Sequence, residues 1–248
     1  MLLPLFAGEL FLPQSDHRSE PGPIRERAGL VGSAPSVAGS ECGVVSEGEG
    51  GEAAEAYLRV REREGRILAD QLVADLPIVP DDHPHVAEWR LRADSAERLI
   101  GYLRGLGRPL KIVELGCGNG WLSSHLAQLE GSQVVGVDNN AVELEQARRV
   151  FGRQENLTFG RADMVEDELP IDRPDIVVMA AALQYVPAPG PCLARIARTM
   201  AAHGELHVLD TRIYESADVP AAQERSRRYY ESVGVPQMAS HYHHHDWA

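Results

Sequence analysis

The stretch of sequence that decides the fold is VELGCGNGW, residues 113–121. It contains an E-x-G-x-G-x-G pattern, formed by Glu114, Gly116, Gly118 and Gly120. Glycines permit a tight turn with positive φ and let a ligand approach the backbone closely. The free N–H groups of a helix that starts near Gly120 would attract an anionic group such as a carboxylate. The stretch therefore predicts a ligand-binding loop between a strand and a helix.

Strand-like and helix-like segments alternate around and after this loop. Apolar, β-rich runs occupy residues 111–115, 133–138, 157–163, 175–181 and 205–210, and helical spacing occupies residues 120–130, 141–151 and 191–201. Asn140 is a natural N-cap for the second of these helices. The alternation predicts an α/β fold, with a doubly wound, mostly parallel, Rossmann-like sheet. Such sheets bind ligands at the carboxyl ends of their strands.

The residues before the loop differ in character from those after it. We expect residues 1–52 to form a flexible or disordered N-terminal segment, because residues 14–51 are rich in Gly, Ser, Pro and Glu. Helical periodicity then spans residues 53–76, with an interruption near Gly65, and residues 84–106. These two helices predict a helical cap or lid over residues 53–108, ahead of a ligand-binding domain over residues 109–248.

The end of the chain departs from an ordinary α/β domain. Only 38 residues, 211–248, follow Asp210, and the spacing after Pro220 predicts a helix up to Ser232. One short strand fits around residues 241–247, but a full C-terminal strand hairpin does not. Either the chain is truncated or the sheet edge is finished in another way. An uncovered edge favours pairing with another chain, so an edge-strand dimer is one possible oligomeric state.

Two further acids stand at expected strand ends. Asp138 closes the second strand, where a carboxylate can accept hydrogen bonds from ribose hydroxyls, and Asp163 closes the third, where it can accept one from an adenine amino group. Together with Glu114 they describe a pocket for an adenosine that carries an amino acid rather than phosphates. The glycine spacing also differs from the G-x-G-x-x-G of dinucleotide sites. The alternative is that Asp138 caps a helix and Asp163 serves a loop.

Four segments, VELGCGNGWLS, VVGVDNN, GRADM and DIVVMAAALQYVP, resemble the successive motifs of class I S-adenosylmethionine-dependent methyltransferases, particularly the type 11 group. The resemblance covers residues 111–214. It implies that Glu114, Gly116, Gly118 and Gly120 line the methionine end of the cofactor, with Cys117 between them as a small loop residue rather than a nucleophile. It further implies that Asp138 holds the ribose, that Asn139, Asp163 and Met164 surround the adenine, and that Ala180, Ala181 and Gln184 face the sulfonium and the acceptor.

The resemblance implies methyl transfer to a small-molecule or lipid-like acceptor. Such a transfer depends on positioning the acceptor and excluding water, and it requires a general base only if the acceptor must lose a proton early. The catalytic residues stay unassigned, with four candidates near the strand ends: His207, Tyr185, Asp210 and Tyr214. His207 can equally be a packed strand residue, and Trp121 can pack in the core or stack on the cofactor. The two helices before the loop are expected to set acceptor specificity.

Composition narrows the remaining classes of partner. The chain has 248 residues, a formal net charge of −13 and a pI near 5.2, so we expect no nucleic acid partner. Arg225, Arg227 and Arg228 form a short basic patch, which we interpret as a solvated helix face. No apolar run reaches the roughly 20 residues of a membrane span. The N-terminal MLLPLFAGELFLP has no Lys or Arg ahead of its apolar run, unlike a signal peptide.

The cysteines and histidines predict neither a disulfide framework nor a metal site. The three cysteines, Cys42, Cys117 and Cys192, form no CxxC pair, which suits a reducing cytoplasm. The C-terminal SHYHHHDWA offers metal ligands, but its spacing matches no closed zinc motif, and it is equally able to cover the mouth of the active site.

Two alternatives to an active methyltransferase stay open at this point. A nicotinamide-dependent oxidoreductase would need the dinucleotide glycine spacing and a proton donor in a following region. A non-catalytic module would keep the fold, and with it cofactor binding, without turnover.

Overall fold

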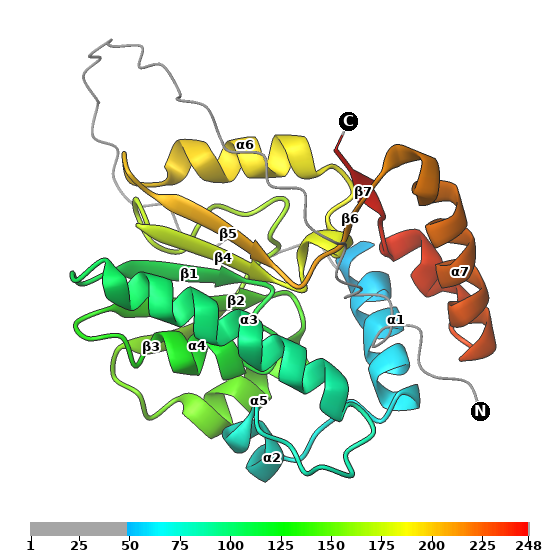
Figure 1. Cartoon of the computed structure of the whole chain (residues 1–248), viewed down its shortest axis with the longest axis horizontal. Helices are drawn as coiled ribbons and strands as arrows, with labels where there is room; N and C mark the ends of the chain where they lie inside the picture. The colour runs from blue at the N-terminus through cyan, green and yellow to red at the C-terminus, as the bar shows by residue number, and fades with distance from the viewer. Residues whose placement is uncertain (1–48, 248) are drawn as a thin grey trace, which may run out of the picture.

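The computed structural model describes residues 49–247, which form a five-stranded sheet with helices on both faces (Figure 1). The strands are β1 (Lys111–Leu115), β2 (Gln133–Asp138), β3 (Leu157–Arg161), β4 (Ile176–Ala180) and β5 (Glu205–Leu209). Their order is β3-β2-β1-β4-β5, and every neighbouring pair is parallel. The predicted doubly wound parallel sheet is confirmed.

The central strands are apolar because both faces of a parallel sheet are covered. Val113 of β1 pairs in register with Val135 of β2 and Val177 of β4, and four of the five β1 residues are buried. The strand order reverses on either side of β1, since β2 lies on one side and β4 on the other. This topological switch point opens a crevice at the carboxyl end of β1, where the glycine loop begins.

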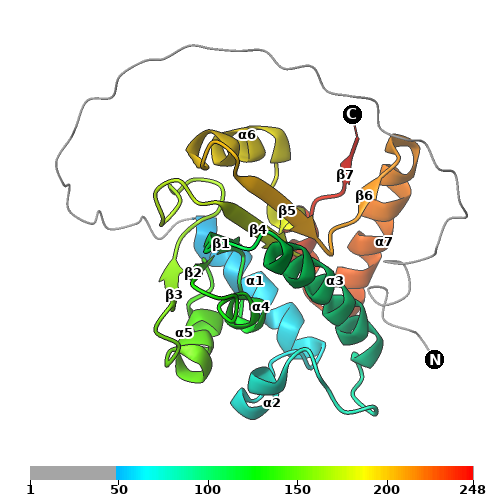
Figure 2. The ribbon, with the colours of Figure 1, turned by 60° about the vertical axis from the view of Figure 1, so that its left-hand side comes forward.

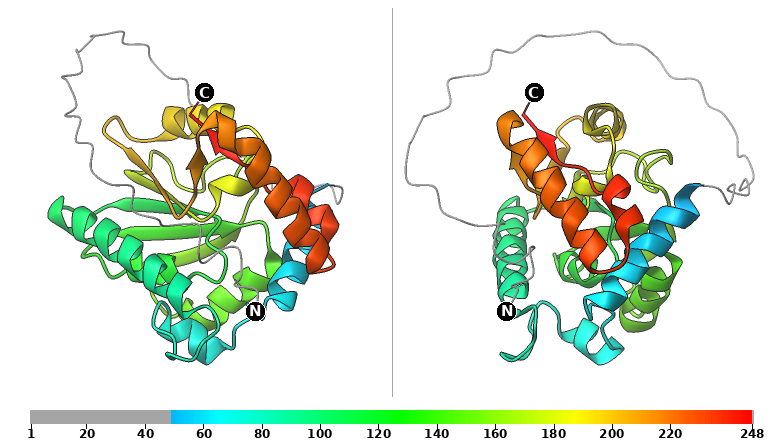
Figure 3. Two further views of the ribbon diagram at one scale, coloured as in Figure 1. Left: turned by 45° about the vertical axis from the view of Figure 1, so that its right-hand side comes forward. Right: turned by 90° about the vertical axis from the view of Figure 1, so that its right-hand side faces the viewer.

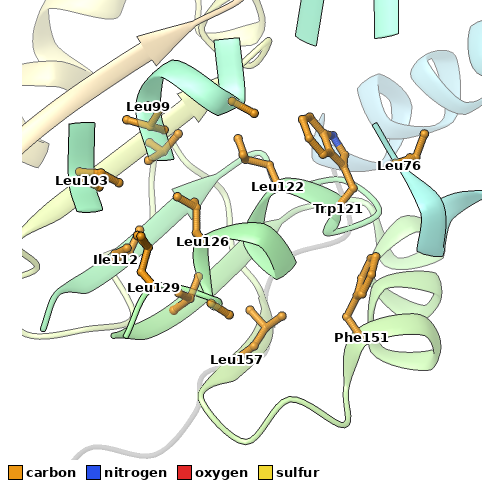
Figure 4. Close-up of a cluster of buried hydrophobic side chains, with 14 of the residues drawn as sticks. Leu76, Leu99, Leu103, Ile112, Trp121, Leu122, Leu126, Leu129, Phe151 and Leu157 are labelled. Carbon is orange, nitrogen blue, oxygen red and sulfur yellow. The ribbon is translucent and has the colours of Figure 1, made fainter. Parts of the chain in front are cut away.

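Three helices cover one face of the sheet: α3 (Val86–Gly105), α4 (Trp121–Leu126) and α5 (Ala141–Phe151). Figure 4 shows their apolar side chains meeting those of the strands, with Leu99 and Leu103 of α3 beside Leu122 and Leu126 of α4. The α5 helix begins where predicted because the Asn140 side chain accepts hydrogen bonds from the N–H groups of Val142 and Glu143, at 3.1 and 3.4 Å.

The opposite face is covered by one helix and a loop. The α6 helix (Pro189–Thr199) buries Cys192 and Ile196 against Val113, Val177 and Met179 of the sheet. The chain between β3 and β4 contributes Met164, Leu169 and Ile171 to the same cluster without forming a helix. Figures 1 and 2 show α6 lying across this face, on the side of the sheet away from α3.

The helices before β1 differ from the expected cap. The first, α1 (Glu49–Arg63), begins four residues earlier than expected, so residues 49–52 are helical; residues 1–48 of the expected flexible segment lie outside the described part of the chain. A short α2 (Asp70–Asp75) follows and binds α5, because Asp70 pairs with Arg149 at 2.9 Å. The α3 helix packs into the core of the domain through Leu99 and Leu103.

The C-terminal part forms a separate layer beyond the carboxyl ends of the strands (Figures 1 and 3). It contains β6 (Ile213–Tyr214), η2 (Ser216–Asp218), α7 (Val219–Ser232), η3 (Pro236–His241) and β7 (His245–Asp246). The strands β6 and β7 pair in parallel, apart from the five-stranded sheet. An apolar cluster formed by Ala56, Val60, Tyr230, Val235 and Met238 joins this layer to α1.

From β1 to β5 the element boundaries follow the sequence expectations to within about two residues, with one informative exception. The helix expected over residues 120–130 ends at Leu126, and the chain then tightens through N–H bonds from Gln128 to His125 and from Leu129 to Leu126. Leu129 stays buried in this turn, which explains why its spacing suggested a longer helix. None of the helices within residues 49–247 combines the length and apolarity of a bilayer crossing.

Because α3 packs in the core, we expect substitutions on its buried face to lower the free energy of unfolding. Leu103 is 1% exposed, so Leu103→Ala should leave a cavity and lower the free energy of unfolding by about 2–5 kcal/mol. Arg98→Ala, on the exposed face of the same helix, should change it by less than about 0.5 kcal/mol. Urea denaturation followed by circular dichroism measures both. Equal stability of the two variants would mean that α3 is detachable from the domain.

Candidate functional site

A cavity of about 170 Å³ lies at the carboxyl ends of β1, β4 and β5. The glycine loop contributes to one wall through Gly116, Cys117 and Gly118, while α1 and α7 contribute side chains from the layer that covers the strand ends. Figure 3 shows α1 and α7 beside one another in this layer. The cavity thus combines the predicted glycine loop with parts of the chain that are far from it in sequence.

The glycine loop is held against β2 by its own backbone. The N–H groups of Gly116 and Cys117 both donate to the carbonyl oxygen of Val137, at 2.8 and 3.0 Å. Gly116 has φ +74°, and a Cβ atom there would lie 2.7 Å from the Cβ of Ala182. Gly118 has φ +51°, and a Cβ atom would lie 3.3 Å from a carboxylate oxygen of Glu143. Glycine is required at both positions by the backbone and by these neighbours.

Asp138 fixes the loop from behind. One of its carboxylate oxygens accepts the N–H of Gly118 and the other accepts the N–H of Asn140, each at 2.8 Å. Burial raises the pKa of Asp138, while these backbone hydrogen bonds act in the opposite direction. In this structure Asp138 supports the loop and does not line the cavity. Its predicted contact with a ribose stays a prediction.

Two buried carboxyl groups face the cavity beside the loop. Glu114, on β1, accepts a hydrogen bond from the hydroxyl of Ser123, and burial raises its pKa to about 8. Glu143 occupies the first turn of α5; burial raises its pKa to about 7, although Arg61 acts to lower it. The guanidinium of Arg61 lies 3.6 Å from the Glu143 carboxylate. Close to neutral pH, both groups can therefore hold a proton.

A buried ion network forms another part of the wall. Glu88, at the start of α3, binds Arg66 at 2.6 Å and Arg92 at 2.9 Å, and Arg66 also binds Glu64 at 2.7 Å. Burial alone would raise the pKa of Glu88, but Arg92 and Arg66 together lower it to about 2. These charges neutralise one another, which is the condition under which buried ions are tolerated.

Tyrosines are prominent in the lining of the cavity. Six of the seven tyrosines in the chain line it: Tyr57, Tyr185, Tyr214, Tyr229, Tyr230 and Tyr242. The ring of Tyr185 packs edge-on against Tyr57 and Tyr242, with centroids 5.6 and 5.9 Å apart. Burial raises the pKa of Tyr185 to about 12, so its hydroxyl stays protonated at neutral pH.

The carboxyl ends of β4 and β5 carry an unusual backbone. Ala181 and Asp210 have φ values of +51° and +53°, and the N–H of Ala181 donates to the carbonyl of Leu209 at 2.9 Å. Positive φ is unfavourable for a residue with a Cβ atom, and such residues gather at functional sites. Asp210 also accepts a hydrogen bond from Ser95 at 2.7 Å, and burial raises its pKa. Both residues line the cavity.

The structure brings most of the predicted site residues together. The cavity is lined by Glu114, Gly116, Cys117, Gly118, Ala180, Ala181 and Gln184, and by the candidates Tyr185, Asp210 and Tyr214. The remaining predicted residues are near the loop or farther away and do not line the cavity: Gly120, Asp138, Asn139, Asp163, Met164 and His207.

Three of these outlying residues have evident local roles. Asp163 caps a turn, since its carboxylate accepts the N–H groups of Val165 and Glu166 at 2.7 and 3.2 Å. Gly120, with φ +78°, starts α4 where an added Cβ would lie 2.6 Å from the ring of Phe159. His207 bonds Glu205 at 3.1 Å and packs on Tyr102, which places it among packed strand residues.

Several lining residues were not anticipated: Tyr57, Arg61, Arg66, Glu88, Arg92, Glu143, Arg212 and Arg225. Arg225 in particular was assigned to a solvated face together with Arg227 and Arg228. The structure separates them, because Arg227 and Arg228 are exposed and each binds Glu224 at 2.7 Å, whereas Arg225 lines the cavity. Trp121 lines the cavity and is also buried against Trp89, with ring centroids 5.7 Å apart.

The C-terminal histidines fasten the chain end beside the cavity. The backbone N–H of His243 donates to Gln184 at 2.7 Å, and the rings of His244 and His245 bond Ser226 and the carbonyl of Leu183, at 2.9 and 3.0 Å. No cluster of three His, Cys, Asp or Glu side chains among residues 49–247 is arranged to hold a metal ion. These contacts agree with a covering role for the segment.

Comparison with known proteins gives one family. Residues 107–247 match the family described as a methyltransferase domain. Trans-aconitate 2-methyltransferase of Acidovorax sp. (strain JS42) is 34% identical over 132 residues, 53% of this chain and 48% of the relative. Malonyl-[acyl-carrier protein] O-methyltransferase of Legionella pneumophila is 30% identical over 126 residues, 50% of this chain and 44% of the relative. The chain thus spans about half the length of these curated relatives.

Solved structures of the same kind are also similar. A TehB-like SAM-dependent methyltransferase from Corynebacterium glutamicum is 26% identical, with a TM-score of 0.41, covering 50% of this chain and 69% of its own.

The buried carboxyl group of Glu114 makes stability depend on pH. Its pKa is about 8 in the folded chain, against an ordinary value of 4.5, so the folded state keeps a proton that the unfolded state releases. Stability should therefore fall as pH rises from about 5 to 8, by up to roughly 1.4 kcal/mol per pH unit. Glu114→Gln, which still accepts the Ser123 hydroxyl, should lose this dependence.

Chemical denaturation at pH 6 and pH 8 measures the effect. The wild-type chain should lose more stability between these two pH values than Glu114→Gln does, whereas Glu130→Gln, at an exposed position, should follow the wild type. Parallel pH profiles for wild type and Glu114→Gln would contradict the assignment.

Proposed function

The chain belongs to the methyltransferase-domain family, and we propose on this basis that it binds S-adenosylmethionine and transfers a methyl group to a small-molecule or lipid-like acceptor. The observation that carries the proposal is the E-x-G-x-G-x-G loop, which leaves the carboxyl end of β1 and lines the cavity at the topological switch point of the sheet. The relatives that match about half of the chain include methyltransferases named for trans-aconitate, for a malonyl group on acyl-carrier protein and for carbon 24 of a sterol.

The charges around the loop suit the amino-acid end of this cofactor. S-adenosylmethionine has a positive sulfonium, a positive amino group and one carboxylate, and it has no phosphates. Glu114 and Glu143 offer acceptors for the cationic groups. Arg61 offers a cation, and its buried Nε atom has no hydrogen-bond partner among the described residues. A ligand carboxylate would complete this site and relieve the unpaired donor.

We propose the following contacts for the cofactor. Glu114, Gly116, Cys117, Gly118 and Gly120 surround the methionine end; Asp138 binds the ribose; Asn139, Asp163 and Met164 surround the adenine; Ala180 and Gln184 lie near the reacting atoms. Tyr57, Arg61 and Glu143 join this set because they line the cavity beside the loop.

The chemistry that the cofactor supplies is an electrophilic methyl group on sulfur. The protein's contribution is to hold an acceptor atom in line with that group and to keep water out. The layer formed by α1, α7 and η3 keeps water out, because its apolar cluster closes over the strand ends. A general base is required only for an acceptor that must lose a proton, and Asp210 and Tyr214 are the candidates inside the cavity. Tyr185, the third candidate in the cavity, keeps its own proton near neutral pH because burial raises its pKa to about 12.

Calorimetric titration of the full chain with S-adenosylmethionine, S-adenosylhomocysteine and NADH tests the proposal. Micromolar binding of both sulfur ligands, with no binding of NADH, is the expected result. Binding of NADH alone would indicate a nicotinamide-dependent oxidoreductase instead. Binding of the sulfur ligands without turnover of any acceptor would indicate a non-catalytic module.

A matched pair of glycine substitutions tests the role of the loop. Gly118→Ala forces a side chain into positive φ and against the Glu143 carboxylate, so it should weaken S-adenosylhomocysteine binding by at least tenfold. Gly101→Ala makes the same chemical change inside α3, where an added Cβ meets nothing within 4 Å, and should leave binding unchanged. Calorimetry measures both affinities. Equal binding by the two variants would remove the loop from the site.

A further inference from the structure

The charged side chains that line the cavity balance one another. Among the described residues, five acids and five arginines contribute to the lining: Glu64, Glu88, Glu114, Glu143 and Asp210, with Arg61, Arg66, Arg92, Arg212 and Arg225. Glu88 binds Arg66 at 2.6 Å and Arg92 at 2.9 Å. Glu143 lies 3.6 Å from Arg61. The formal charges of this lining therefore cancel, and much of the cancellation is by direct pairing.

The arginines of the lining have partners within the chain. Arg66 also binds Glu64, at 2.7 Å. Arg212 stacks on a tyrosine ring, with its guanidinium carbon 4.9 Å from the ring centroid, and both Arg212 and Arg225 interact with further groups of the chain. Arg61 has an unbonded Nε, which the carboxylate of the proposed cofactor would take. Among residues 49–247, the lining thus reserves no arginine for a negatively charged acceptor.

Two acids of the lining have a hydroxyl group as their hydrogen-bond partner. Glu114 accepts the hydroxyl of Ser123, and Asp210 accepts that of Ser95 at 2.7 Å. Glu114 belongs to the glycine-loop side of the cavity, which the proposed function gives to the cofactor. Asp210 is therefore the lining acid that is left for the acceptor. A carboxylate has several acceptor sites on its two oxygen atoms, so Asp210 can accept a further hydrogen bond from a ligand.

Asp210 lies beside residues that the proposed function puts near the reacting atoms. Ala181, directly after β4, donates its N–H to the carbonyl oxygen of Leu209 at 2.9 Å. Thr211 donates its hydroxyl group to the side-chain oxygen of Gln184, also at 2.9 Å. The residues on either side of Asp210 are thus bonded to the chain at the end of β4. This arrangement holds the Asp210 carboxylate at the junction of the two strand ends.

The junction has the features of a reactive position. Asp210 and Ala181 both have positive φ, +53° and +51°, and such conformations gather at functional sites. Burial raises the pKa of Asp210, although Ser95 and Arg92 act to lower it, so its carboxylate is a stronger base than an exposed one. The charge of Arg92 also lowers the pKa of Tyr185, which indicates that Tyr185 and Asp210 lie in the same part of the cavity.

An aromatic surface begins next to the junction. Tyr185 ends η1 (Leu183–Tyr185) and directly follows Gln184. Its ring packs edge-on against Tyr57 and Tyr242, with centroids 5.6 and 5.9 Å away, and Tyr230 continues the row 6.1 Å beyond Tyr242. Tyr57 and Tyr185 are half-buried and line the cavity, so other side chains do not cover their rings completely. Aromatic rings favour such contacts with one another, so this surface suits an aromatic ligand.

We propose that the methyl acceptor is a small uncharged phenol, whose ring packs on the tyrosines beside Gln184 and whose hydroxyl group donates a hydrogen bond to Asp210. The proposal rests on the methyltransferase function proposed above and narrows its acceptor. As the phenol oxygen bonds the methyl carbon, the C–S electron pair stays on sulfur and the hydroxyl proton moves to the Asp210 carboxylate. The products are a methyl ether and S-adenosylhomocysteine, and Asp210 then releases the proton to water.

The first test is calorimetric titration of the full chain saturated with S-adenosylhomocysteine. The probes are phenol, catechol and p-cresol, each compared with its fully methylated ether, which lacks the hydroxyl donor. Cyclohexanol, trans-aconitate and benzylamine represent a saturated alcohol, a carboxylate and a cation. At least one phenol should bind, and it should bind at least tenfold more tightly than its ether and than each of these three compounds.

Three results of this titration would overturn the proposal. They are binding of no phenol, equal binding of a phenol and its ether, and tighter binding of cyclohexanol, trans-aconitate or benzylamine than of every phenol. Because the comparison uses the wild-type chain, it does not depend on the folding of a variant.

A substitution of the carboxylate tests the role of Asp210. Asparagine tolerates positive φ as aspartate does, so Asp210→Asn should fold and should bind S-adenosylhomocysteine within twofold of the wild type. With S-adenosylmethionine and the phenol that binds, it should form the methyl ether more slowly by about a hundredfold or more, because the proton acceptor is lost. Asp172→Asn, at an exposed position before β4, should react like the wild type.

The outcomes separate this proposal from the one beneath it. Ether formation by Asp210→Asn at the wild-type rate would overturn the role of Asp210. Binding of S-adenosylhomocysteine without preference for a phenol would overturn the acceptor and leave the cofactor site intact. Failure of the wild-type chain to bind S-adenosylhomocysteine would instead overturn the methyltransferase function, and the acceptor proposal would fall with it.

Discussion

The pair of hydrogen bonds from Asp138 to the N–H groups of Gly118 and Asn140 is the constraint on which the site depends. Asp138 is the last residue of β2, so its carboxylate joins the end of one strand to the loop that follows another. Gly118 lies three residues before Trp121, the first residue of α4, and Asn140 is the N-cap of α5. One buried side chain therefore sets the position of the glycine loop and the starting points of two helices that pack on the sheet.

The site beside the loop contains carboxyl groups that are largely shielded from water. Burial disfavours their charged forms, and it raises the pKa of Glu114 and Glu143 toward or above neutrality. The unpaired Nε of Arg61 adds a buried donor at the same place. Glu114 accepts the Ser123 hydroxyl and Glu143 lies beside Arg61, so each acid has one partner within the protein and further capacity to accept hydrogen bonds. A ligand with both positive and negative groups matches these acids and Arg61 together, which supports the proposed zwitterionic cofactor.

The sequence predicted the sheet, its strand boundaries and the glycine loop because these features are local. The strands are short apolar runs, the N-cap residue Asn140 marks the start of α5, and the loop has glycine where φ is positive. Much of the cavity wall could not be predicted in the same way. Tyr57 and Arg61 reach the loop from a helix that precedes it by more than fifty residues. The core packing of α3 could not be predicted either, because an amphipathic pattern shows that a helix face is buried but not which element it packs against.

The fold constrains the glycine loop more tightly than it constrains the elements after β5. A parallel sheet fixes the loop after β1 and the end of β2, because register and crossover handedness leave little freedom there. The elements after β5 are not held by the hydrogen bonds of the main sheet, because α7 and the β6–β7 pair lie apart from it. Arg225 is an example: its place on one face of α7 brings it to the cavity, and it does not pack in the core of the sheet.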